Sequence, residues 1–152
     1  MKLLALNSLA ATLSAMSFGC AADPGESPAA VIERALTIDA QASHLRNHAC
    51  ETAPIADAVR GYVAALDAIN LDGAPQDFVA ALQSHRDAWL ATLPWMDAVA
   101  ADRGEMHQLL DRIKARDQAR AAALEPLMKQ VFATWTAVDA ATANAGARVP
   151  GS

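Results

Sequence analysis

Apolar residues recur at alternating steps of four and three along most of the chain after residue 28. In the first such stretch they are Val31, Ala35, Ile38, Ala42, Leu45 and Ala49. Residues at this spacing lie on one face of an α-helix, and helices with such faces pack against one another. About a quarter of the chain is alanine, the best helix former, and no segment alternates apolar and polar residues as a half-buried strand does. The sequence therefore predicts an all-helical (all-α) domain.

Three more stretches have the same spacing, and clusters of turn-forming residues separate them. These clusters are residues 51–54, 70–75 and 102–104. Short connections make consecutive helices antiparallel, so we expect an up-down four-helix bundle over 28–145, with a fourth helix over 105–145. Pro94 and Pro126 lie inside the helical pattern and are expected to kink or split their helices, because proline lacks an amide hydrogen and clashes with the preceding turn.

The first 22 residues predict export. Lys2 precedes an apolar run that ends near Met16, and small residues follow, an order typical of a bacterial secretory signal. The run is too short to span a bilayer comfortably. We therefore expect the mature protein in the periplasm or secreted, with residues 23–27 as a tether and 146–152 as a frayed tail.

Cys20 leaves two interpretations of how this leader ends. Gly19-Cys20 resembles the end of a lipobox, in which the cysteine is lipidated and anchors the protein to a membrane. The match is partial, because Ser17 stands where lipoboxes usually have leucine. Cleavage by ordinary signal peptidase is the alternative, and a cut after Gly19 would leave Cys20 able to form a disulfide with Cys50.

Charge argues against two kinds of partner. The net charge is −5, and no block of Lys and Arg occurs that would displace counterions from a nucleic acid or hold an amphipathic helix on a membrane surface. We expect no nucleic-acid binding, and membrane contact only through a lipid on Cys20. The scattered methionines and the absence of a Cys-x-x-Cys-His motif give no indication of a haem or copper cofactor.

Two groups of residues are candidates for chemistry. His44 and His48 are four residues apart on one helix, a spacing at which two imidazoles can share a metal ion. A solvated helix face is the simpler explanation, since no third ligand is required nearby. His85 lies on the apolar face of the third helix. If the third and fourth helices are antiparallel about a turn near Asp102-Arg103, and Pro94 does not break the third, Asp117 and Arg120 lie level with His85. The three residues then form a buried polar layer, either as a pocket with an oriented acid–base pair or as a structural layer.

The aromatic residues also allow two interpretations. They are Tyr62, Phe78, Trp89, Trp95, Phe132 and Trp135. At helical spacing they are expected to belong to the core, and the alternative is an apolar ligand site.

Residues 30–145 resemble small, uncharacterised exported helical proteins and lipoproteins of bacteria. The similarity rests on the stretch from Phe78 through His85 to Trp89, with Thr134-Trp135 and Val138 near the end. It implies a helical bundle behind a signal or lipoprotein leader, and it implies no activity.

No serine or cysteine has a paired base at a recognisable spacing, so we expect a non-enzymatic binding or accessory protein of the bacterial envelope. Its partner would be an envelope protein recognised by exposed helix faces. The alternative is a bundle that binds a small ligand or a metal ion through His44 and His48, or through His85 with Asp117 and Arg120.

Mass spectrometry of the mature N-terminus tests the export prediction. A diacylglyceryl-modified Cys20, or a plain terminus created by cleavage between residues 19 and 23, is the expected product. A protein recovered from the cytoplasm with Met1 or Lys2 still in place would contradict it.

Overall fold

The computed structural model describes residues 25–149, which form helices joined by short connections, with no strand in that range. The helices are α1 (Pro28–Ala49), α2 (Ile55–Asp67), α3 (Gln76–Asp97), α4 (Met106–Arg116) and α5 (Gln118–Asn144). The all-helical prediction is confirmed. The predicted leader with Cys20, the first two residues of the predicted tether and the last three of the predicted tail lie outside the described residues.

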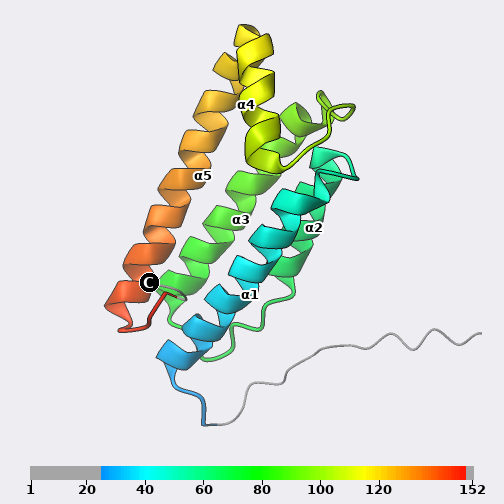
Figure 1. The fold of residues 1–152 in the computed structure, drawn as a ribbon. Helices are drawn as coiled ribbons and strands as arrows, with labels where there is room; N and C mark the ends of the chain where they lie inside the picture. The colour runs from blue at the N-terminus through cyan, green and yellow to red at the C-terminus, as the bar shows by residue number, and fades with distance from the viewer. Residues whose placement is uncertain (1–24, 150–152) are drawn as a thin grey trace, which may run out of the picture.

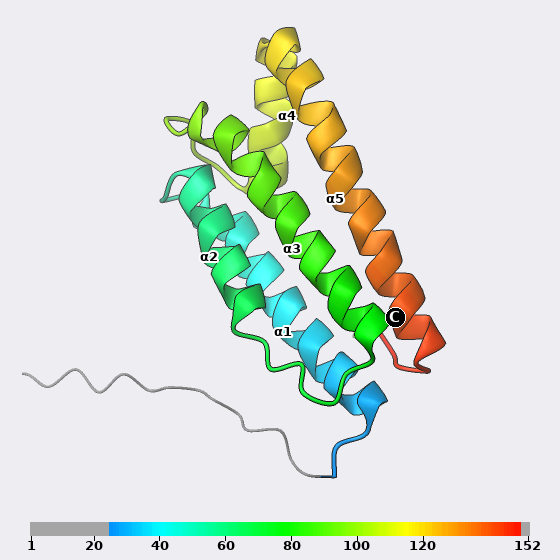
Figure 2. The ribbon, with the colours of Figure 1, turned by 180° about the vertical axis from the view of Figure 1, so that it is seen from behind.

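The long helices run alternately in opposite directions and lie side by side (Figure 1). Helix α3 packs along α5 on one side and against α2 on the other, and α1 packs on α2 (Figure 2). Helices α1 and α5 scarcely touch. Helix α4 and the first turns of α5 project beyond the ends of the other helices. The group of helices is therefore open between α1 and α5.

The predicted fourth helix is two helices, so the expectation of four helices is not confirmed. The break lies at Asp117, whose backbone is extended (φ −139°, ψ 95°). The Asp117 carboxylate accepts the backbone N–H of Arg120 at 3.0 Å, which caps the start of α5. In the sequence, the polar residues Asp117 and Arg120 interrupt the apolar spacing between Ile113 and Leu124, and this interruption marks a helix boundary.

The two prolines do not split their helices. Helix α3 continues through Pro94, and α5 continues through Pro126. Both prolines are on the exposed side of their helices, as are Leu90 and Ala122 four residues earlier. The carbonyl groups that each proline leaves without a helical hydrogen bond can therefore be solvated, which reduces the cost of the proline.

The buried face of α1 is rotated from the predicted one. Leu45 belongs to the predicted apolar face but is 68% exposed, whereas Asp39 and Arg46 are buried. The face that packs on the other helices includes Ile32 and Leu36 together with these two charged residues. Two charges on a buried helix face require partners, and those partners define the site described below.

Several local contacts fix the ends of the helices. The hydroxyl of Ser27 accepts the N–H of Ala30 at 3.3 Å and caps α1. The pair Ser27-Pro28 predicts this start, because a capping hydroxyl followed by proline in the first turn is typical of a helix N-terminus. Gly104, at φ 140°, donates its N–H to the Cys50 carbonyl at 3.0 Å and so joins the α3–α4 connection to the end of α1. Among residues 25–149, no helix combines the length and apolarity needed to cross a membrane.

Candidate functional site

Charged and aromatic side chains from four helices meet in the middle of the fold. We call them the central cluster, which consists of Asp39 and Arg46 of α1, Tyr62 of α2, His85 and Trp89 of α3, and Thr134 and Trp135 of α5. All but Trp135 are buried. Burying polar groups costs free energy unless they are hydrogen-bonded. Throughout residues 25–149, every buried side-chain nitrogen and oxygen has a hydrogen-bond partner.

Arg46 is the cation of the central cluster. Its guanidinium carbon lies 4.0 Å from the centre of the Trp89 ring and 4.5 Å from that of Tyr62, so the charge is held against two aromatic faces. Its hydrogen bonds go to neutral oxygens, at 2.9 Å from Ser43 and at 3.0 and 3.2 Å from Asn47. Burial lowers the pKa of Arg46, but a guanidinium remains protonated at physiological pH.

Asp39 supplies the opposite charge. Its carboxylate accepts the hydroxyl of Tyr62 at 2.5 Å, which links α1 to α2. Burial raises the pKa of Asp39, while the Tyr62 hydrogen bond and the Arg46 charge oppose that increase. Burial, followed by the charge of Asp39, raises the pKa of Tyr62, so the phenol keeps its proton and acts as the donor.

His85 links α3 to α5 through a chain of hydrogen bonds. The indole N–H of Trp89 donates to His85 Nε2 at 3.1 Å, which assigns the proton of the neutral ring to Nδ1. Nδ1 then donates to the Thr134 hydroxyl at 3.1 Å, and that hydroxyl donates to the Val131 carbonyl at 2.9 Å. Burial is the main cause that lowers the pKa of His85 to about 4. At neutral pH the ring is uncharged and both nitrogens are engaged.

The central cluster borders an open cleft. Because α1 and α5 do not close against each other, a cavity of about 200 Å³ lies between them. We call it the central cleft; its lining is Asp39, Ser43, Arg46, Tyr62, His85, Trp89, Val131, Phe132 and Trp135. Phe132 is 66% exposed at the edge of this cleft, an unusual position for a phenylalanine. The arrangement can hold a small molecule between a cation and aromatic walls.

The structure does not bring the predicted polar layer together. His85 is buried, but its partners are Trp89 and Thr134. Asp117 and Arg120 instead pair with each other at 3.0 Å at the start of α5, where Arg120 also donates to the Ala98 carbonyl at 2.9 Å. The physical reason is the helix break at Asp117. Because α4 lies between α3 and the start of α5, the α5 residue beside His85 is Thr134, and Asp117 and Arg120 lie at the far end of α5.

His44 and His48 lie close together on the exposed side of α1. Their ring centres are 4.6 Å apart, and His48 Nδ1 lies 3.0 Å from the Glu51 carboxylate. In the described part of the chain, no three His, Cys, Asp or Glu side chains are placed to hold one metal ion. A metal bound by this pair remains a prediction.

Sequence reasoning missed the charged members of the central cluster. Asp39 and Arg46 are seven residues apart, so they share a helix face with Ile32 and Leu36. The predicted face kept only apolar residues and therefore passed through Leu45 instead. The signal that was available is a pair of opposite charges, two turns apart, within a face that is otherwise apolar.

Removing His85 should change how stability depends on pH. The folded protein resists protonation of His85 down to about pH 4, whereas the unfolded chain takes up the proton near pH 6.5. The free energy of unfolding is therefore expected to decrease between pH 6.5 and 4, by roughly 2 kcal/mol after allowing for water in the cleft. His85→Gln should flatten that decrease in urea unfolding curves, and His44→Gln, on the exposed side of α1, should not. Equal slopes for the wild type and His85→Gln would contradict this assignment.

Comparison of the chain with protein-family models, curated proteins and solved structures gave no match. The resemblance to small exported helical proteins therefore stays a prediction. The geometry of the central cleft supplies the grounds on which a role can be proposed for this fold.

Proposed function

We propose that this chain is an exported helical binding protein that holds a small ligand in the central cleft. The observation that carries the proposal is the position of Arg46. Its guanidinium is buried against Trp89 and Tyr62, yet it lines a cavity that remains open between α1 and α5. Helices that close over a buried polar layer stabilise it more than helices that leave it open, because open packing loses van der Waals contacts. The open cavity beside Arg46 therefore favours a binding role over a purely structural one.

Binding is favoured over catalysis by the state of His85. A general base must reach the proton of a substrate through a free ring nitrogen. Both nitrogens of His85 are held by Trp89 and Thr134, and its low pKa makes it a weak base at neutral pH. The cleft therefore offers recognition groups, and its imidazole serves to position Trp89.

The lining favours a ligand with few atoms. A cavity of about 200 Å³ is smaller than the roughly 300–1,000 Å³ of sites for drug-sized molecules. A guanidinium recognises hydrogen-bond acceptors, carboxylates above all, and the walls of Trp135 and Phe132 suit a flat or apolar body. We expect a small planar molecule that carries an acceptor group.

This proposal favours the small-ligand alternative over recognition of an envelope protein. Recognition of such a protein by exposed helix faces, metal binding by His44 and His48, and the periplasmic, secreted or lipid-anchored location remain predictions. The charge distribution gives no reason to add a nucleic-acid partner.

Filling the cleft tests the proposal. Ser43 lines the cleft on α1, and Ser43→Phe would occupy it, whereas Gln41→Phe adds the same bulk on the exposed side of the same helix. In a screen of small aromatic and aliphatic carboxylates, a true ligand at 100 times its Kd should stabilise the wild type and Gln41→Phe by about 2.7 kcal/mol. Ser43→Phe should lose that stabilisation.

Ser43→Ala provides the second control, since it removes the hydroxyl that Arg46 contacts but leaves the cleft open. It should retain binding. A ligand that stabilises Ser43→Phe as strongly as the wild type would exclude the central cleft as its site.

A further inference from the structure

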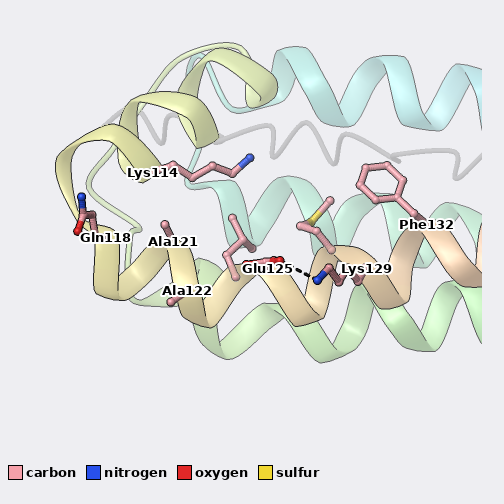
Figure 3. Close-up of a pocket in the computed structure, with 9 residues that line it drawn as sticks. Lys114, Gln118, Ala121, Ala122, Glu125, Lys129 and Phe132 are labelled. Atoms are coloured by element: carbon pink, nitrogen blue, oxygen red, sulfur yellow. Dashed lines mark ion pairs between the residues drawn. The ribbon is translucent and has the colours of Figure 1, made fainter.

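A second and larger hollow lies between α4 and α5. We call it the α4–α5 hollow; its volume is about 500 Å³, and the lining residues used below are Lys114, Ala121, Leu124, Met128, Lys129 and Phe132. Leu124 is fully buried beneath it, and Phe132 stands exposed at its far end. In Figure 3 the Lys114 side chain extends from α4 over α5. This hollow is therefore an apolar trough with a cation above it.

The charges around the α4–α5 hollow favour an anion. The lining holds two lysines and one acidic residue, Glu125, which is already paired with Lys129 at 2.7 Å. Lys114 has Asp111 at 3.5 Å as its partner, and both side chains are largely solvated, so this contact contributes little. In a chain whose net charge is −5, the lining of the hollow is positive.

We propose that the α4–α5 hollow binds a free, single-chain anionic amphiphile. The acyl chain would lie on Ala121 and Met128 along α5, above the buried Leu124, and the anionic head group would pair with Lys114. Small residues such as Ala121 leave room for an unbranched chain, and Phe132 covers its end. This inference goes beyond the proposed function, because it concerns a different cavity and a different ligand class.

The shape of the lining supports a chain over a flat molecule. The apolar residues Ala121, Met128 and Phe132 follow one another at steps of seven and four, so they form a straight row on one face of α5. The volume falls within the roughly 300–1,000 Å³ that is typical of ligand sites. A row of this kind presents a long, narrow apolar surface.

A series of carboxylates tests the inference by calorimetric titration of the full mature chain. Octanoate, nonanoate, decanoate and dodecanoate should bind with affinities that rise roughly fourfold for each methylene buried, until the hollow is filled. Dodecanol tests the head group. Lys114→Gln should weaken dodecanoate by about two- to fivefold and leave dodecanol unchanged, whereas Arg148→Gln, an equal loss of charge elsewhere on the surface, should affect neither.

Plugging variants locate the chain. Ala121→Leu fills the hollow and should weaken dodecanoate at least tenfold, while Ala123→Leu, exposed on the same turn and outside the lining, should not. If Ala121→Leu fails to fold, Lys114→Gln still tests the inference. In that variant dodecanoate should bind more weakly, and dodecanol should bind as tightly as it does to the wild type. Dodecanoate binding that is lost in Ser43→Phe and kept in Ala121→Leu would overturn this inference and support the central cleft.

Other occupants give different results. If none of the carboxylates from octanoate to dodecanoate binds, the inference is overturned, and the screen of smaller aromatic and aliphatic carboxylates against the central cleft is unaffected. If the protein sediments with phosphatidylglycerol vesicles but does not bind free dodecanoate, its partner is a bilayer surface. A dimer in light scattering that Phe132→Ser converts to a monomer would show a second copy of the chain in the hollow. Either of these outcomes would overturn it as well.

Discussion

The burial of Arg46 and Asp39 on one face of α1 is the constraint on which the rest of the structure depends. Removing two charges from water costs several kcal/mol for each ion, so their partners must be held firmly in place. Tyr62 serves both, since it donates to Asp39 and lies under Arg46. Trp89 completes the stack on Arg46. These contacts fix the rotation of α1 against α2 and α3.

The same constraint explains why the fold is open along α5. Helix α1 places its largest buried side chain, Arg46, toward α2 and α3, and α5 is held instead to α3 through His85 and Thr134. The face of α5 between these attachments and α4 is left uncovered. Both hollows border this face and share Phe132 as a lining residue, but they are separate cavities with different chemistry. The central cleft is polar and aromatic, and the α4–α5 hollow is apolar with a positive rim.

The parts of the fold set by local chemistry could be predicted from the sequence. The spacing of Ile55, Val59 and Tyr62, the Ser27 cap and the Gly- and Pro-containing turns all act over one or two helical turns, and each agrees with the structure. The rotation of α1 and the break at Asp117 were not predicted. The rotation depends on distant residues, whereas the break has only a local signal, the Asp117 cap, which is easily taken for one polar turn of a longer helix. Arg46 is buried only because Tyr62 and Trp89 can receive it, and Asp117 ends α4 at a point where helical pattern continues. His85 was recognised as buried, but its partner Thr134 depends on a register that a single unbroken helix does not give.

A double-mutant cycle between Asp39→Asn and Arg46→Met tests the central claim most directly. If Tyr62 couples the two charges into one buried unit, either single change leaves the other charge without compensation and costs about 3 kcal/mol of unfolding free energy. The double variant should then lose at least about 1 kcal/mol less than the two single losses combined. Additivity within about 0.5 kcal/mol would show that Asp39 and Arg46 act independently and would contradict the account.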